Sequence, residues 1–551
     1  MRLAIIFFCL VSQTLIAQTN AFPDRPKVVV GIVVDQMRQD YIYRYWGRLG
    51  EGGFKRLVNE GFMMKNGHYN YMPTYTGPGH ASVYTGTTPG VHGIIGNDWY
   101  DKGAKKMVYC AEDQNRKVVG ATEGEGMSPW RMLTTTVTDE LELATQRRSK
   151  VVGISIKDRG AILPAGHTPD GAYWYDDKTG KFISSNYYKA ALPVWLDRFN
   201  ARNLADKYLN ETWNTLYPID SYKESGPDDS PYEEILDDGL GIKSKTRPTF
   251  PYNLKELRKE SPEFQLLTQT PFGNDLLFEL AVAAFDGEEM GKDEWTDFLA
   301  VSFSSTDKLG HAVGPNSVEI EDMYLRLDKN IEALLNKFDK ELGKGQYLVF
   351  LTADHGAADV EQYLIDLKVI PTAYQPVDIK TGLRDYLGSY FPGKNLIENI
   401  SNNQIFFNMG AFADDPKSSG VEYLVTSELV RNYLMGLDGV ADVFTKNMIQ
   451  TSAFEEQGVK GNIKRGFHSK RSGDVVFVKE SGSTGMAKGT THGSVYTYDT
   501  HVPILFFGYG VKQGTTANYH TITDIAPTVS TILKIKFPSG CTGQPIDELL
   551  K

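Results

Sequence analysis

Cysteine is scarce in this sequence, with only 3 in 551 residues. Cys9 lies in the apolar N-terminal segment, so Cys110 and Cys541 are the cysteines of the remaining chain. A fold built on many disulfides is therefore excluded. An oxidising compartment would permit a bridge between Cys110 and Cys541, but the sequence does not establish one.

Basic residues are also in deficit, because 58 Lys and Arg stand against 69 Asp and Glu, for a net charge of -11. A nucleic-acid scaffold normally has a basic patch that dominates its charge balance. We therefore expect no such role. The hydrophobic content of 41% is ordinary for a globular protein and sufficient for a large core.

Long apolar runs are almost absent. One run extends from Leu3 to Ala17 after Met1-Arg2, and no second stretch of about 18 apolar residues follows. The run is short for a membrane span and has the form of a secretory signal peptide, which we place at residues 1–17. The sequence thus predicts a periplasmic or secreted protein with no membrane span.

Five nearly continuous apolar runs predict strands that are buried on both faces of a sheet. They cover residues 27–34, 151–156, 298–303, 347–353 and 502–508. Helical patterns lie between them, including a long stripe from Ile320 to Leu342 that ends at Gly343. This alternation predicts an α/β fold with a mostly parallel central sheet and helices on both faces.

Two regions interrupt the alternation, and we expect them to be insertions that cap the sheet. The first is rich in Pro, Tyr, Trp and Asp and contains a hairpin signal at 177–180; the second contains small strands such as 474–478 and Gly/Ser-rich connections. The predicted division is a core of 27–160, 273–361 and 486–551, with insertions at 161–272 and 362–485.

Acidic and histidine side chains follow the predicted strands at their carboxyl ends, where open α/β sheets bind ligands. Asp35 closes the first strand, and Asp354 and His355 follow the fourth strand in TADHG. Asp35 taken alone could be only a helix N-cap. Beside Asp354 and His355, however, it has the character of a zinc ligand.

A second set has the same character. Asp307 and His311 follow a strand in FSSTDKLGH, and His492 lies in TTHGS before the last strand. A lone histidine is commonly a hydrogen-bonded structural residue, and we assign that role to the others, at positions 68, 80, 92, 167, 468, 501 and 520. Six ligands would hold two zinc ions with three protein ligands each, leaving positions open for substrate.

Thr76 lies in PTYTGPGHASVYTG, where turn residues precede a plausible helix. Its ordinary role would be an N-cap. The same position favours anions through free amides and the helix dipole, and a neighbouring metal would favour the alkoxide. Thr76 is therefore a candidate nucleophile and metal ligand together.

These residues, in this order, resemble the alkaline phosphatase superfamily, and most closely the phosphate-irrepressible alkaline phosphatases of flavobacteria. Further resemblance lies in GIIGNDWY with Asn97, in SIKDRG with Lys157 and Arg159, and in the C-terminal THVPILFFGYG and TDIAPTVSTIL. Without the resemblance, Asn97 could simply shape a turn, and Lys157 and Arg159 could be a solvated pair. The resemblance spans nearly the whole chain after the signal peptide.

The resemblance implies a site of two zinc ions. It assigns one ion to Asp307, His311 and His492, and the other to Asp35, Asp354, His355 and the nucleophile Thr76. It also implies that Asn97, Lys157 and Arg159 contact phosphoryl oxygens, and we expect an amide of the Thr76 helix to join them. Because the family uses the Lys and Arg in place of a third metal site, no obligatory Mg²⁺ is predicted.

The implied activity is hydrolysis of a broad range of small phosphate monoesters, through a phosphothreonine intermediate, to phosphate and an alcohol, in the service of phosphate acquisition. A sulfatase is disfavoured because Thr76 is followed by Gly-Pro-Gly-His rather than x-Pro-x-Arg. A phosphodiesterase or nucleotide pyrophosphatase remains open, since it would share all but Lys157 and Arg159. A noncatalytic exported zinc- or phosphate-binding protein is the alternative from another class.

Overall fold

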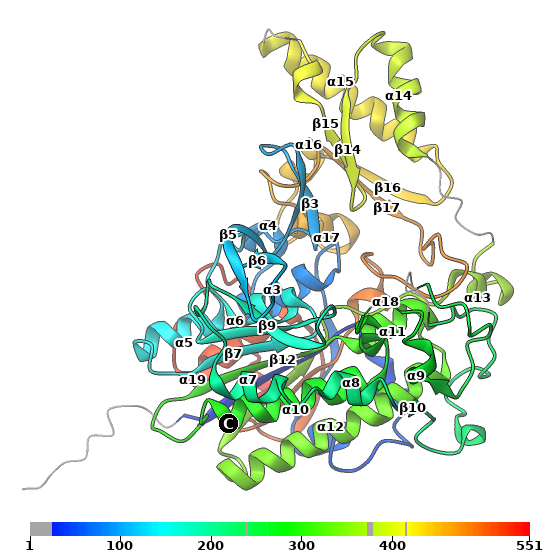
Figure 1. The fold of residues 1–551 in the computed structure, drawn as a ribbon. Helices are drawn as coiled ribbons and strands as arrows, with labels where there is room; N and C mark the ends of the chain where they lie inside the picture. The colour runs from blue at the N-terminus through cyan, green and yellow to red at the C-terminus, as the bar shows by residue number, and fades with distance from the viewer. Residues whose placement is uncertain (1–24, 237–240, 262, 372–377, 414–415, 551) are drawn as a thin grey trace, which may run out of the picture.

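A computed structural model describes residues 25–236, 241–261, 263–371, 378–413 and 416–550. The predicted signal peptide at 1–17 lies outside these residues. The described chain forms a large α/β body, with a second lobe built mainly from the segment after residue 378 (Figure 1).

The body is built around a sheet of eleven strands, and all five predicted strands belong to it. Its order is β19 (Gly514–Thr521), β2 (Phe62–His68), β18 (Ile504–Gly508), β13 (Tyr347–Thr352), β1 (Val28–Val34), β12 (Asp297–Phe303), β7 (Val151–Ser155), β8 (Gly171–Asp176), β9 (Lys181–Ser185), β5 (Glu112–Val119) and β6 (Glu125–Met127). From β13 to β8 all neighbours are parallel. β18 runs antiparallel to both of its neighbours. The predicted mostly parallel α/β fold is confirmed.

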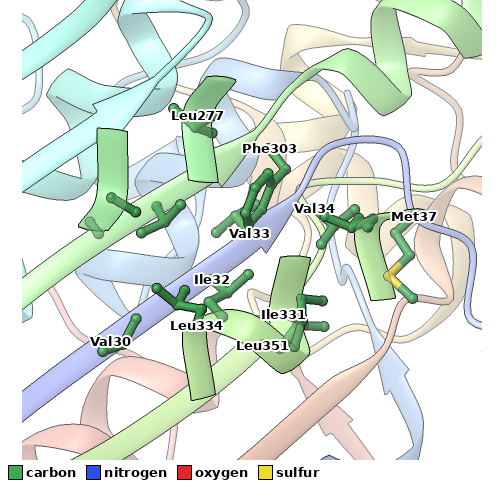
Figure 2. Packing of buried hydrophobic residues seen from close by; sticks show 14 of the residues in the cluster. Val30, Ile32, Val33, Val34, Met37, Leu277, Phe303, Ile331, Leu334 and Leu351 are labelled. Atoms are coloured by element: carbon green, nitrogen blue, oxygen red, sulfur yellow. The ribbon is translucent and has the colours of Figure 1, made fainter. Parts of the chain in front are cut away.

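The central strands are buried on both faces because helices cover each side. α3 (Thr76–Thr85) and α6 (Asp158–Ala165) lie on one face, and α10 (Pro271–Gly287) and α12 (Val318–Leu342) lie on the other (Figure 1). Every residue of β1 is buried. Figure 2 shows Val30, Ile32 and Val33 of this strand among side chains that include Leu277 of α10 and Leu334 of α12. This packing fixes the strand ends that carry the site.

The first predicted insertion begins with residues of the sheet itself. α6 covers 158–165, and β8 and β9 extend the sheet through a turn at 177–180, where the hairpin was predicted. The later residues include the short pair β10 (Thr212–Trp213) and β11 (Tyr252–Asn253). The division of the chain into core and insertions stays a prediction.

The second predicted insertion contains a sheet and a hydrophobic core of its own. The strand order is β14 (Ile397–Ser401), β15 (Gln404–Phe407), β17 (Val475–Lys479) and β16 (Val440–Thr445). α14 (Ile379–Tyr390) and α15 (Pro416–Met435) pack on it, through side chains that include Leu383 and Val430. Figure 1 shows this lobe above the body.

Cys110 and Cys541 are both free thiols. Cys110 is fully buried, and burial raises its pKa to about 12. Burial also raises the pKa of Cys541 to about 11. The bridge that the sequence permits is not formed.

Candidate metal and phosphate site

Three adjacent strands bring five of the predicted ligands to one edge of the sheet. β1 lies between β12 and β13, with Val34 opposite Phe303 and Val33 opposite Thr352. Asp35 follows β1, Asp354 and His355 follow β13, and α11 (Ser305–Val313) follows β12 and carries Asp307 and His311. In-register parallel pairing therefore places residues that are far apart in sequence side by side.

Asp35, Asp354 and His355 form the first ligand group. Each offers one ligand atom within 4.8 Å of the other two, and all three side chains are fully buried. Asp35 Oδ1, Asp354 Oδ2 and His355 Nε2 have no hydrogen-bond partner. Two buried carboxylates with open lone pairs are costly unless a cation lies between them. The group thus has the composition and the unmet atoms of a metal site.

The protonation tendencies of this group fit the same conclusion. Burial, reinforced by the charge of Asp35, raises the pKa of Asp354 well above its usual value. Burial lowers the pKa of His355 to about 3, so its ring is neutral and able to bind a metal. A cation would relieve the repulsion between the carboxylates.

Asp307, His311 and His492 form the second group, again with ligand atoms within 4.8 Å of one another. Nε2 of His311 lies 3.2 Å from Asp307 Oδ1, and Nε2 of His492 lies 3.5 Å from the same oxygen. The His492 ring stacks on His355 at 3.4 Å between centroids, which joins the two groups. His311 is partly exposed, so this group is open to solvent.

Each of the three histidines is oriented by a backbone carbonyl at Nδ1, which leaves Nε2 directed at the carboxylates. The pairs are His311 with Thr490 at 2.8 Å, His355 with Gly356 at 2.9 Å and His492 with Thr74 at 2.8 Å. The ligand nitrogens are thus set before any metal is bound.

Gln36 connects the two groups and was not predicted from the sequence. Its backbone N–H donates to Asp354 Oδ1 at 3.1 Å, and its side-chain amide donates to Asp307 Oδ1 at 2.7 Å. Its φ of 62° lies in the left-handed region, which is uncommon for a residue other than glycine. A Cβ at Gly310 would lie 2.0 Å from Gln36 Oε1, so a larger residue there would displace the Gln36 side-chain amide.

Thr76 is the first residue of α3, as predicted, and its side chain is buried beside Lys157. Lys157 Nζ lies 3.5 Å from Thr76 Oγ1 and 2.7 Å from Asp35 Oδ2, and it also contacts Asp307 Oδ2. Burial lowers the pKa of Lys157, but the charges of Asp307 and Asp35 outweigh burial and raise it. A permanent cation therefore lies between the hydroxyl and both ligand groups.

Asn97 lies against the start of α3. Its Oδ1 accepts from the Gly77 N–H at 2.7 Å, so the Nδ2 end of the amide remains to donate. Asn97 takes the N–H of Gly77 and Pro78 has none, so neither residue supplies the helix amide that we expected to bind a phosphoryl oxygen. The helix-amide contact itself stays a prediction. The amide of Gly79 donates to Tyr75.

Arg159 is held by Tyr109, a second residue that sequence reasoning missed. Its NH1 donates to the Tyr109 hydroxyl at 3.1 Å, and that hydroxyl donates to Asp158. Arg159 and Lys157 line one cavity of about 350 Å³. The sequence shows Tyr109 only as one of 30 tyrosines, so no signal distinguished it.

His80 is the predicted structural histidine that lies nearest the site. Its Nδ1 pairs with the Thr76 carbonyl at 2.9 Å and its Nε2 with Ser302 Oγ at 2.8 Å. Burial lowers its pKa to about 4. It therefore ties the start of α3 to β12 and belongs to neither ligand group among the residues described.

Comparison with known proteins agrees with this arrangement. Residues 29–502 match the family described as type I phosphodiesterase / nucleotide pyrophosphatase. The chain is 46% identical to alkaline phosphatase PafA of Elizabethkingia meningoseptica, over 97% of this chain and 96% of that protein. The chain belongs to the alkaline phosphatases of this family. Alkaline phosphatase PhoV of Synechococcus elongatus is also 46% identical, over 97% of this chain and 95% of its own.

The solved structure of PafA matches this alkaline phosphatase with a TM-score of 0.90 and 45% identity, over 97% of this chain and all of that one. Another solved form of PafA has a threonine, an asparagine, a lysine and an arginine replaced. This alkaline phosphatase is a phosphomonoester hydrolase with a metal cofactor. Across the described part of the chain, no helix is long and apolar enough to cross a membrane.

Proposed function

We propose that this alkaline phosphatase uses two zinc ions, with Thr76 as its nucleophile and Asn97, Lys157 and Arg159 as its phosphoryl ligands. The observation that carries the proposal is the position of Lys157 Nζ, which reaches Thr76 and a carboxylate of each ligand group. Nucleophile, cation and both candidate metal sites are thus joined in one cluster.

The residues of the two groups suit zinc. Asp35, Asp354 and His355 would hold one ion, with Thr76 as a further ligand, and Asp307, His311 and His492 would hold the other. When bound, the ions would act as Lewis acids that favour the Thr76 alkoxide and neutralise charge on the phosphoryl group. Because Lys157 already supplies a positive charge between the groups, we propose that Mg²⁺ is not obligatory.

The reaction proceeds in two displacements. Thr76 Oγ1 loses its proton to solvent and attacks phosphorus, the bond from phosphorus to the substrate oxygen breaks, and the leaving oxygen takes a proton to become the alcohol. Water then attacks the phosphothreonine, and phosphate leaves as the Thr76 hydroxyl is restored. Lys157 and Arg159 balance the charge of the phosphoryl oxygens, and Asn97 Nδ2 donates to one of them.

The nucleophile is tested by trapping. Enzyme that is acid-quenched during turnover of a ³²P-labelled monoester should carry the label on Thr76. Thr76→Ser should retain more activity than Thr76→Ala, because serine keeps the hydroxyl. Recovery of the label on another residue would refute the assignment.

Phosphodiester hydrolysis is the second candidate activity, because the matching family is described by it. Lys157 and Arg159 should favour monoesters, since a diester lacks one charged oxygen. Each charged hydrogen bond contributes about 1.5 to 3 kcal/mol, which is roughly ten- to more than a hundredfold in rate.

The discriminating experiment replaces both residues by Ala and compares p-nitrophenyl phosphate with bis-p-nitrophenyl phosphate. We expect kcat/KM to fall far more for the monoester. An equal fall for both substrates would mean that the pair serves folding or general binding, and it would favour the phosphodiesterase assignment.

We also propose that the enzyme is exported, on the evidence of the signal-like residues 1–17. Fractionation of a host that expresses the full chain should place the activity outside the cytoplasm. A variant that lacks residues 1–17 should stay inside the cell. Equal distribution of the two forms would contradict the proposal.

A further inference from the structure

Tyr109 lies at the point where a hairpin meets the phosphate-binding residues. Its hydroxyl donates to Asp158 and accepts from Arg159 NH1 at 3.1 Å. Because the Tyr109 hydroxyl both donates and accepts a hydrogen bond, it cannot rotate freely. It therefore restricts the position of the Arg159 guanidinium that donates to it. Arg159 Nε is buried and has no hydrogen-bond partner. The contact with Tyr109 therefore decides where NH1 lies.

The hairpin consists of β3 (Asp98–Asp101) and β4 (Lys106–Tyr109), and Asp98 pairs with Tyr109 at its base. Directly below, the Cys110 N–H donates to the Asn97 carbonyl at 2.8 Å. Asn97 in turn accepts from Gly77 at the start of the nucleophile helix. The base of the hairpin thus places Asn97 next to Tyr109, the residue that holds Arg159.

The second lobe supports the same hairpin from its other side. Asn402, in the turn between β14 and β15, donates through Nδ2 to the Asp98 carbonyl at 2.6 Å. The ring of Tyr100 packs edge-on against Phe406 of β15, at 5.4 Å between centroids. Figure 1 shows β3 between the lobe and the body. The lobe therefore contacts the hairpin at its base, through Asp98, and farther along β3, through Tyr100.

We infer that Tyr109 is a positioning residue that fixes Arg159 for the phosphoryl group, beside Asn97 at the base of the same hairpin. This inference rests on the proposed function, because it assumes that Arg159 binds a phosphoryl oxygen. Tyr109 acts through Arg159 and contributes no group to the reaction itself. Its loss should therefore weaken the discrimination that Arg159 provides and leave Thr76 and the ligand groups in place.

The test begins with Tyr109→Phe, which removes the hydroxyl and keeps the ring. We expect kcat/KM for p-nitrophenyl phosphate to fall about tenfold, as for the loss of one hydrogen bond to a charged group. For bis-p-nitrophenyl phosphate the fall should be about twofold or less. The inhibition constant of inorganic phosphate should rise with the loss of monoester activity.

The matched control is Tyr208→Phe. The Tyr208 hydroxyl also donates to a carboxylate that pairs with an arginine, through Glu279 and Arg202, and it lies outside the site. This variant should change neither the kinetic constants nor the inhibition by phosphate. Asp158→Asn is the second test variant, because it weakens the acceptor of the Tyr109 hydroxyl, and we expect the same monoester-selective loss.

A double-mutant cycle of Tyr109→Phe and Arg159→Ala shows whether Tyr109 acts by positioning Arg159 or has a separate role. In the Arg159→Ala background, Tyr109→Phe should lower monoester kcat/KM by less than about twofold. A fall as large as in the parent enzyme, or an equal fall for monoester and diester, would overturn the inference. If Arg159→Ala itself leaves monoester selectivity unchanged, the proposed function fails instead, so the two failures are distinguishable.

Discussion

At Gly79, even the small change from glycine to alanine should damage the site. It lies in the first turn of α3, three residues after Thr76, and the helix packs there on the end of β13. A Cβ added at Gly79 would lie 2.4 Å from the carbonyl oxygen of Asp354 and 2.8 Å from its Cβ. Cβ contacts below 3.0 Å essentially do not occur, so helix and ligand must separate by at least 0.6 Å.

This displacement determines how much kcat/KM should fall in Gly79→Ala. A misplacement of about 1 Å in an active site costs on the order of a hundredfold in rate, so we expect a ten- to hundredfold lower kcat/KM, roughly. Overpacking destabilises by about 1 to 3 kcal/mol, while alanine favours the helix by about 1 kcal/mol over glycine. The folded protein should therefore lose at most about 2 kcal/mol and remain intact.

The assay combines steady-state kinetics on p-nitrophenyl phosphate with bound-metal analysis and thermal unfolding. Gly388→Ala is the control, because Gly388 lies in helix α14 and a Cβ there would meet nothing within 4 Å. That variant should keep full activity and unfold at the same or a slightly higher temperature. Parental activity in Gly79→Ala would refute the claim that this contact positions the nucleophile.

Three further predictions follow from the metal groups, a buried histidine and the free thiols. Chelation should abolish activity, and zinc should restore it at about two ions per chain. His311→Ala should lose bound metal and turnover together. Full activity after exhaustive metal removal would contradict this prediction. Burial lowers the pKa of His92 from 6.5 to about 3, so the native state keeps it neutral while the unfolded state takes up a proton below pH 6.5. His92 should consequently contribute a loss of about 1.4 kcal/mol of stability per pH unit from pH 6.5 toward 3, and His92→Gln should reduce the overall slope by that amount in denaturant titrations. An unchanged slope would exclude a contribution from His92. Denatured enzyme without its signal peptide should release two titratable thiols, Cys110 and Cys541, whereas native Cys110 should resist alkylation at pH 8; an absence of thiols after denaturation would reveal a bridge.

The strands and their ends could be predicted because burial on both faces leaves a direct signal in the sequence. β1 reads VVVGIVV without interruption, and Asp35 follows at the point where the apolar run stops. Strand direction leaves no such signal. The run at 502–508 looks like those of the parallel strands, yet β18 pairs antiparallel. The direction of a strand depends on where the preceding chain enters the sheet and not on the strand's own residues.

Residues that support the site were harder to predict than those that form it. Gln36 acts through a left-handed backbone conformation that is stabilised by contacts from Asp307 and Asp354, neither of them near it in sequence. Tyr109 acts through a hydroxyl that meets Arg159 only after the hairpin folds back. Both depend on tertiary placement, and neither side chain has a type or spacing that indicates its role.

The carbonyls that orient the three candidate ligand histidines have a consequence for how the sequence of the enzyme can vary. The acceptors at Thr74, Gly356 and Thr490 are backbone atoms, and every amino acid supplies the same oxygen. Replacement of Thr74 or Thr490 by serine, which keeps the hydroxyl that each donates to a backbone carbonyl, should therefore leave the ring orientations unchanged. The orientation of the histidine rings therefore depends on the backbone and not on which side chains lie at these positions. The contacts of Lys157, Arg159 and Tyr109 are made by side chains, so substitutions can change them. An ancestor with this metal frame could change its preference among phosphate esters without first rebuilding the metal site.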